Sequence, residues 1–146
     1  MLSISTEALW QFSLAVYPQR QDELLHWQDA HEANVNLALL CLYLDRRAVA
    51  LSSEQIAALN RLVQIFSSTH TAQIRKCRRH MKEHKAALIQ YKQIRERLLQ
   101  AEMLLEQQEQ RLLLDFFNQN IASISTAQGD NNWFQYQQLL LSSNQD

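Results

Sequence analysis

Positively charged residues are concentrated in one stretch of the chain, Thr71 to Arg97. This stretch holds nine Lys or Arg against two acidic residues, whereas residues 1–68 hold four against seven and residues 98–146 hold one against six. On a helix, five of these cations fall within an arc of about 120°: Arg75, Arg78, Arg79, Lys82 and Lys85. Cations aligned along one helix face could neutralise the phosphates of RNA or another polyanion, or bind an acidic protein.

Two other interpretations of the basic face stay open. It could be solvated, or it could pair with the chain's own acidic C-terminal part, at Glu102, Glu106 and Glu109. Contact with a membrane is not expected, because the opposite face of the helix carries an apolar stripe, including Ile74 and Met81, that belongs in the core. No aromatic residue interleaves the five cations, which argues against base stacking on single strands.

Histidines in the same stretch form the pattern H-x-x-E-H, from His80 to His84, which occurs in a class of zinc enzymes. Three candidate zinc ligands then share one helix face: Cys77, His80 and His84. The arginines and lysines around them would repel a dication, whereas metal sites usually have carboxylates near their ligands. We therefore expect ordinary core or surface histidines, with neither a metal nor a cofactor.

Catalytic motifs are scarce in this chain. Its single glycine, Gly129, cannot supply a phosphate-binding loop, a dinucleotide fingerprint or a nucleophile elbow, each of which needs at least two glycines. His26 and Asp29 lie about one helical turn apart, but no nucleophile accompanies them. Four aromatic residues could line a small-molecule pocket, although such residues at helical spacing usually belong to the core: Trp10, Tyr17, Trp27 and Tyr43. We expect a protein without enzymatic activity.

The composition predicts an all-α protein. The chain has one glycine and one proline, too few for the turns of a β-rich fold, and good helix formers dominate it. At 146 residues we expect a single domain spanning 1–146, with an N-terminal bundle over 1–68 and a long helical segment with a closing helix over 69–141. Five to seven helices are expected in total.

Local signals place the helices of the N-terminal bundle. We expect a first helix from Ser5 or Thr6 to Pro18, which should end it, and a second from Gln19 to His31. A third helix should run from about Asn34 to Arg47 and be the most buried, because its centre is apolar all round. The fourth should begin with a capping box, Ser52 with Gln55, and end at the polar run Ser67 to Thr71.

Nothing in residues 71–120 forces a helix to stop. One long helix and a helix kinked near Glu83–Ala87 are equally compatible with the sequence. A heptad-like series of residues forms a seam along its second half: Tyr91, Ile94, Leu98, Leu105 and Leu112. A helix this long should pack its far end on a second copy or on the closing helix, which follows a loop from Ser123 to Asn132.

Three short motifs of the N-terminal half carry a resemblance to a known family: Leu9-Trp10-x-Phe12, Gln28-Asp29-x-His31 and Val35-Asn36-Leu37-x-Leu39-Leu40. Over about residues 8–85 the chain resembles a family of small proteobacterial all-helical proteins of unknown function. It departs from that family at Glu32-Ala33, where relatives tend to carry a glycine, and at Tyr43, where they tend to carry tryptophan. The resemblance implies a bacterial cytoplasmic helical domain and brings no activity, cofactor or site residue.

The function we expect is that of a non-enzymatic helical protein-interaction module. The seam would bind a protein partner or a second copy, because it is longer than one small core requires. The first alternative is an RNA- or polyanion-binding protein that uses the basic face 75–85, and the second is a metal-binding protein or enzyme. We expect a cytoplasmic location with reduced thiols, because the two cysteines suggest no disulfide framework and the longest apolar run, Leu37 to Leu44, has eight residues.

Overall fold

The computed structural model describes residues 3–121 and 131–143 of the chain. Within these residues it contains six α-helices and no strand, which confirms the all-α prediction. The helices are α1 (Thr6–His31), α2 (Val35–Arg46), α3 (Ser53–Phe66), α4 (Ala72–Glu83), α5 (Tyr91–Asn120) and α6 (Asn132–Ser143). A π-helical turn, η1 (Ser67–Thr71), joins α3 to α4, and a 3₁₀ turn, η2 (Lys85–Ala87), follows α4.

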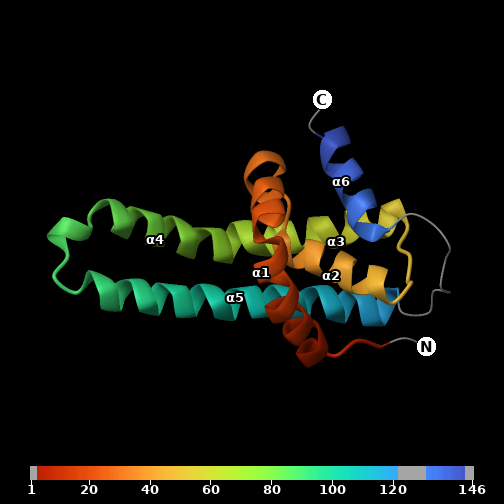
Figure 1. Cartoon of the computed structure of the whole chain (residues 1–146), viewed down its shortest axis with the longest axis horizontal. Coiled ribbons are helices and arrows are strands. Elements are labelled where there is room, and N and C mark those ends of the chain that lie inside the picture. The colour runs from red at the N-terminus through yellow and green to blue at the C-terminus, as the bar shows by residue number, and fades with distance from the viewer. Residues whose placement is uncertain (1–2, 122–130, 144–146) are drawn as a thin grey trace.

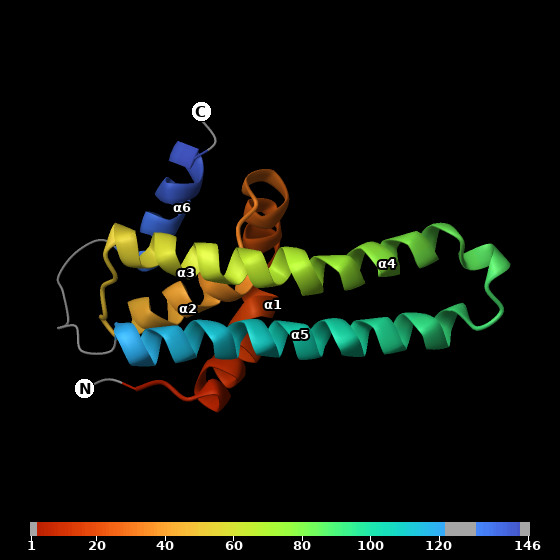
Figure 2. The ribbon, with the colours of Figure 1, turned by 180° about the vertical axis from the view of Figure 1, so that it is seen from behind.

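The helices form a bundle from which a helical hairpin protrudes. The rod made by α3, η1 and α4 runs antiparallel to α5, and α1 crosses both steeply near the middle of the molecule (Figure 1). The view from behind shows that α2 and α6 lie at one end of this hairpin, whereas its turn lies at the other end (Figure 2). We call the protruding part, residues 72–101, the arm.

The hydrophobic core lies entirely in the bundle. Every residue of α2 from Asn36 to Leu44 is buried, as its all-round apolar pattern predicts. The surrounding helices contribute Leu59 and Val63 of α3, Leu113 and Phe117 of α5, and Tyr136 of α6. By contrast, α4 has no buried residue. Within the arm, α4 is therefore held by its packing on α5 and by ion pairs to α5 rather than by the core.

The prediction that Pro18 ends the first helix is wrong. A single helix, α1, continues to His31 with a kink at Arg20, where φ is −123° and ψ is 18°. Proline removes one backbone hydrogen bond but keeps a helical φ, so it can kink a helix that neighbouring contacts hold together. Val16 before the kink and Leu24 after it are both buried in the core, which anchors the two halves of α1.

The predicted break at Ser67 to Thr71 is also wrong. The chain stays helical there, as the π-turn η1, because it contains no glycine or proline and its Thr69 hydroxyl donates a hydrogen bond to the carbonyl of Ile65, at 2.7 Å. A π-turn inserts one extra residue into the helix, so the side chains that follow it are rotated about the helix axis. Here Thr71, fully buried, faces α5.

Residues 71–120 form neither one long helix nor a kinked one. The chain reverses direction between Glu83 and Tyr91, so that α4 and α5 lie side by side. The reversal falls at the place where a kink was considered, because Leu88 adopts an extended backbone with ψ of 106°. Because the chain folds back, the half-buried apolar stripes of α4 and α5 cover each other.

The predicted closing helix is present as α6, whereas most of the predicted loop from Ser123 to Asn132 lies outside the described residues. The capping box predicted for Ser52 and Gln55 is formed at the start of α3. Among the described residues, no helix combines the length and the apolar character that crossing a bilayer requires.

Candidate functional site

Two of the five cations predicted on the basic face are paired within the molecule. Nε of Arg75 lies 2.9 Å from Oε1 of Glu102, and Nη2 of Arg75 lies 3.2 Å from Oε1 of Glu106. Nε of Arg78 lies 2.9 Å from Oε2 of the same Glu102. The expectation that the whole basic face lies opposite the apolar stripe is therefore wrong, because Arg78 is only about 40° around the helix from Ile74.

Burial and neighbouring charges shift the pKa values of several residues in and beside this ion-pair network. Burial raises the pKa of Glu106, and although Arg75 lowers it, the charges of Glu102 and Glu109 raise it further. Burial lowers the pKa of Arg75, but the hydrogen bonds and charges of Glu102 and Glu106 outweigh that effect and raise it. Burial also raises the pKa of Tyr17, and the negative charge of Glu106 adds to this. Arg75 thus stays charged while Glu106 carries a costly negative charge.

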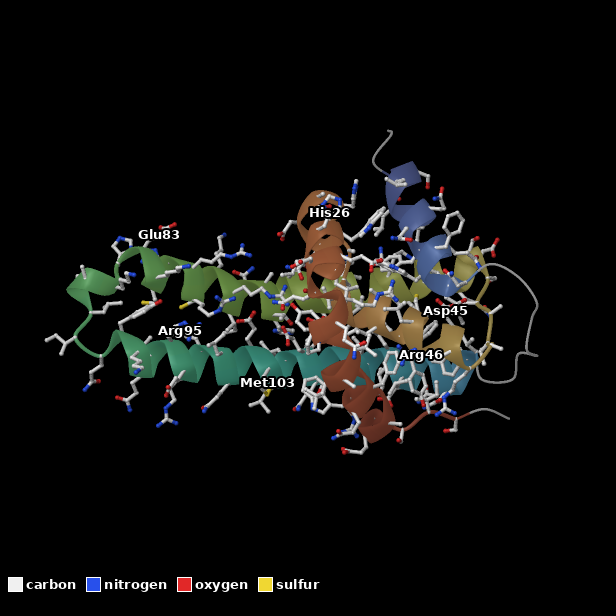
Figure 3. All side chains as sticks on the ribbon, viewed as in Figure 1. His26, Asp45, Arg46, Glu83, Arg95 and Met103 are labelled. Atoms are coloured by element: carbon white, nitrogen blue, oxygen red, sulfur yellow. The ribbon has the colours of Figure 1, made fainter. Side chains whose placement is uncertain are left out.

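The other cations of the arm are exposed. Arg79, Lys82 and Lys85 of the predicted face reach solvent, as does Lys76. The chain reversal adds three exposed cations from the start of α5: Lys92, Arg95 and Arg97. Figure 3 labels Glu83 and Arg95, which lie on the two helices of the arm. With Glu83 and Glu96 as its acidic residues, the arm exposes seven cations against two carboxylates.

The predicted interaction seam is half-buried over its whole length. Its five residues, Tyr91, Ile94, Leu98, Leu105 and Leu112, each keep partial exposure. In the arm, α4 packs on α5 and covers this side of the helix. The apolar residue that remains fully exposed there is Ile89, in the turn, with a relative accessibility of 102%. The most accessible apolar group of the arm is thus at its tip.

The structure brings together a different set of metal-ligating residues from the one predicted. Ligand atoms of His80, Glu83 and His84 lie within 4.8 Å of one another, and all three residues are exposed. Cys77 is half-buried and is outside this group. Nδ1 of His84 lies 2.9 Å from the carbonyl oxygen of His80, so this nitrogen already has a partner. His26 and Asp29, the other pair considered, are both exposed on α1.

A cavity of about 1280 Å³ lies where α1 crosses the hairpin of α3 to α5, and we call it the crossing cavity. Two of the four aromatic residues considered for a pocket, Trp10 and Tyr17, line it. Tyr43 instead packs edge to face on Phe12, with ring centroids 5.2 Å apart, and Trp27 packs on Trp133. Tyr43 therefore belongs to the core, and Tyr17 and Trp27 pack against it.

A buried polar network forms the wall of the crossing cavity. Glu109, 1% exposed, accepts hydrogen bonds from Nδ2 of Asn34 at 2.8 Å and Nδ2 of Asn36 at 3.2 Å. Its other oxygen accepts a hydrogen bond from the hydroxyl of Thr71. Next to it Gln110, 2% exposed, donates from Nε2 to Oγ of Ser13 at 2.9 Å and to Oδ1 of Asn36 at 3.0 Å.

Sequence reasoning missed most of this network. It suggested Glu109 as a partner for the arginines, but Glu109 instead joins α5 to η1 and α2. It placed Asn34 only at the start of a helix, and Asn34 does cap α2, because its Oδ1 accepts a hydrogen bond from the amide of Leu37 at 2.9 Å. The available signal was the run of six polar residues 106–111 in α5, which extends over more than one full helical turn, so that some of its residues must face inward.

Comparison with known proteins gives one match. A family model described as "Protein of unknown function (DUF2390)" matches residues 8–113. No curated protein and no solved structure matches the chain. The matched residues contain nearly all of α1, all of α2 to α4 and most of α5, so they include the arm and the polar network of the crossing cavity.

Proposed function

We propose that this chain, which belongs to the DUF2390 family of proteins of unknown function, is a helical protein-interaction module that binds an acidic partner protein through its arm. The family match agrees with the resemblance noted from the N-terminal motifs, and it extends further, to residue 113. Since the family description names no activity, the proposal rests on the geometry of the arm.

The observation that carries the proposal is the combination of Ile89 and the cations around it at the end of a protruding hairpin. A fully exposed isoleucine in a turn contributes nothing to the core, and α4 buries no residue there either. Protein interfaces typically combine an apolar centre with a polar rim, and charges on the rim speed association with an oppositely charged partner. The seven exposed cations of the arm supply such a rim and favour an acidic partner.

Photo-crosslinking tests this proposal. A photoreactive residue at position 89 is expected to give discrete crosslinked species in living cells, because Ile89 would lie in the centre of the interface. Position 65 is the matched control, since Ile65 is also an exposed isoleucine, at 69%, but lies on α3 outside the arm. The mass of the adduct shows whether the partner is a second copy of the chain or another protein.

The difference in crosslinking between positions 89 and 65 decides whether the proposal holds. Crosslinks at position 89 that disappear when Lys82 and Lys85 are replaced by glutamate support the proposal. Equal crosslinking at positions 89 and 65, or none at position 89, contradicts it. Sedimentation of the purified protein at micromolar concentration gives an independent measure of self-association.

Binding of RNA or another polyanion is a second candidate, and the exposed cations of both arm helices favour it. The double variant Lys82→Glu and Lys85→Glu is expected to remove measurable binding to a fluorescent RNA, because it turns two attractive charges into repulsive ones. Single replacement of Lys82 should reduce the slope of log affinity against log salt by about 1. Arg61→Glu is the control, since Arg61 is exposed on α3. Binding that does not depend on salt concentration would exclude a site on the arm. So would binding that Arg61→Glu weakens as much as the double variant does.

A further inference from the structure

We propose that the crossing cavity binds a small organic amine in its protonated, cationic form, with the ammonium group held beside Glu109 and Gln110. The cavity shares Ala72, Arg75, Arg79 and Leu99 with the arm but contains none of Lys82, Lys85 and Ile89, so the inference goes beyond the proposed function. It rests on the charge of the cavity wall, on one buried acceptor without a partner, and on apolar surfaces that suit a hydrocarbon chain.

The wall of the crossing cavity has an excess of negative charge. Five carboxylates and two arginines, Arg75 and Arg79, line it, and Arg78 pairs with one of these carboxylates from outside the lining, which leaves a formal charge of −2 with histidine neutral. Three of the carboxylates, Glu102, Glu106 and Glu109, lie at successive turns on one face of α5. Arg75 and Arg78 neutralise part of this charge through Glu102 and Glu106, but no arginine pairs with Glu109 among the described residues. A cationic ligand would compensate the excess.

Among the side-chain amides of Asn36 and Gln110, the atom left without a hydrogen-bond partner is an acceptor and not a donor. A carboxylate only accepts hydrogen bonds, so Asn36 must turn its Nδ2 toward Glu109 and its Oδ1 toward Gln110. Gln110 must then turn its Nε2 toward Asn36. Ser13 is consistent with this, because its hydroxyl donates to the carbonyl of Leu9 at 2.8 Å and so accepts from Gln110.

The remaining oxygen, Oε1 of Gln110, is buried and has no hydrogen-bond partner among the described residues. A buried acceptor without a partner is unfavourable, so a ligand that donates a hydrogen bond there would be favoured. A protonated amine supplies such a donor together with a positive charge. The amide nitrogens nearby already donate to Glu109, to Asn36 and to the hydroxyl of Ser13, so this part of the wall favours a cation over an anion.

The rest of the cavity suits an aliphatic or aromatic chain attached to the ammonium group. Trp10 and Tyr17 of α1 line one side, and both rings can contact methylene groups or the cation itself. Leu14, Leu39 and Met103 add apolar surface. Figure 3 shows Met103 on the side of α5 that faces away from α4. With about 1280 Å³, the space exceeds a single ammonium group by far and accommodates a ligand of polyamine size.

Isothermal titration with putrescine and spermidine tests the inference, with choline as the control ligand because its quaternary nitrogen has no N–H. The wild-type chain is compared with Glu106→Gln, with Gln110→Met, which removes the free acceptor, and with Glu54→Gln. Glu54 is exposed at the start of α3 and does not line the cavity, so this variant loses the same charge elsewhere. Circular dichroism checks that each variant keeps its helices.

We expect at least one of the two amines to bind the wild-type chain and Glu54→Gln equally, with choline weaker. Gln110→Met should weaken the binding of the amine by about tenfold or more, because it removes a hydrogen bond to a charged group. Glu106→Gln should weaken it by a similar factor, because it removes one negative charge from the cavity wall. No binding at millimolar amine, equal binding of choline, or equal weakening by Glu54→Gln overturns the inference. Should Gln110→Met lose its helices, Glu106→Gln decides alone, because the Glu106 side chain is 34% exposed and tolerates replacement better.

Discussion

Replacement of Glu109 by alanine is expected to lower the free energy of unfolding by about 3–5 kcal/mol, because it leaves several buried groups without partners. Asn34, Asn36 and Thr71 all donate hydrogen bonds to this carboxylate. These donors come from α2, its cap and η1, so Glu109 connects three segments of the chain that are distant in sequence. Its loss should loosen the contact of α5 with both α2 and the rod of α3 and α4.

Urea unfolding followed by circular dichroism measures this effect. Glu109→Gln should lose less than Glu109→Ala, because one oxygen remains to accept hydrogen bonds. Glu96→Ala is the matched control: Glu96 is exposed on the same helix, so its replacement should change stability by less than about 0.5 kcal/mol. If Glu109→Ala were as stable as Glu96→Ala, the buried network would not hold α5 in place.

Replacement of Asn132 by alanine is expected to cost about 2–4 kcal/mol, because two buried backbone groups lose their partner. Asn132 is fully buried at the start of α6. Its Oδ1 accepts a hydrogen bond from the amide of Leu51 at 2.7 Å, and its Nδ2 donates to the carbonyl of Val49 at 2.7 Å. Both groups lie in the connection between α2 and α3, so one side chain holds α6 against that connection.

The same unfolding experiment, with Asn120→Ala as control, checks this prediction. Asn120 is exposed at the end of α5 and donates only to a carbonyl of its own helix, at 3.0 Å, so its replacement should be close to neutral. A second measurement is hydrogen exchange at the amide of Leu51, which should become faster in Asn132→Ala. Unchanged exchange there would show that Asn132 does not protect this amide.

Local sequence signals were sufficient to predict the class of fold and the starts of several helices. Ser5, Asn34 and Ser52 cap α1, α2 and α3, each through a hydrogen bond to an amide three residues further along the chain. Such caps depend on a few neighbouring residues, and the sequence displays them directly. The burial of α2 could be predicted for the same reason, since a helix that is apolar on all sides can only be stable inside a core.

The interior of the chain from Ser67 to Tyr91 could not be predicted from local signals. Neither the continuation of the helix through η1 nor the reversal after Glu83 requires glycine or proline, and the sequence offers neither residue there. The reversal is stabilised by contacts between α4 and α5, including the pairing of Arg75 with Glu106, 31 positions apart. Propensity within a window of a few residues contains no information about such contacts.

The sequence by itself determined that this protein is helical, where its first helices begin, and that its positive charge lies in residues 71–97. Only the tertiary structure decided which cations stay free, that Glu109 meets Asn34 and Asn36 rather than arginines, and that a cavity forms beneath α1. The physical reason is distance along the chain. Helix formation depends on neighbours within a turn or two, whereas these contacts join residues more than twenty positions apart and exist only once the helices have packed.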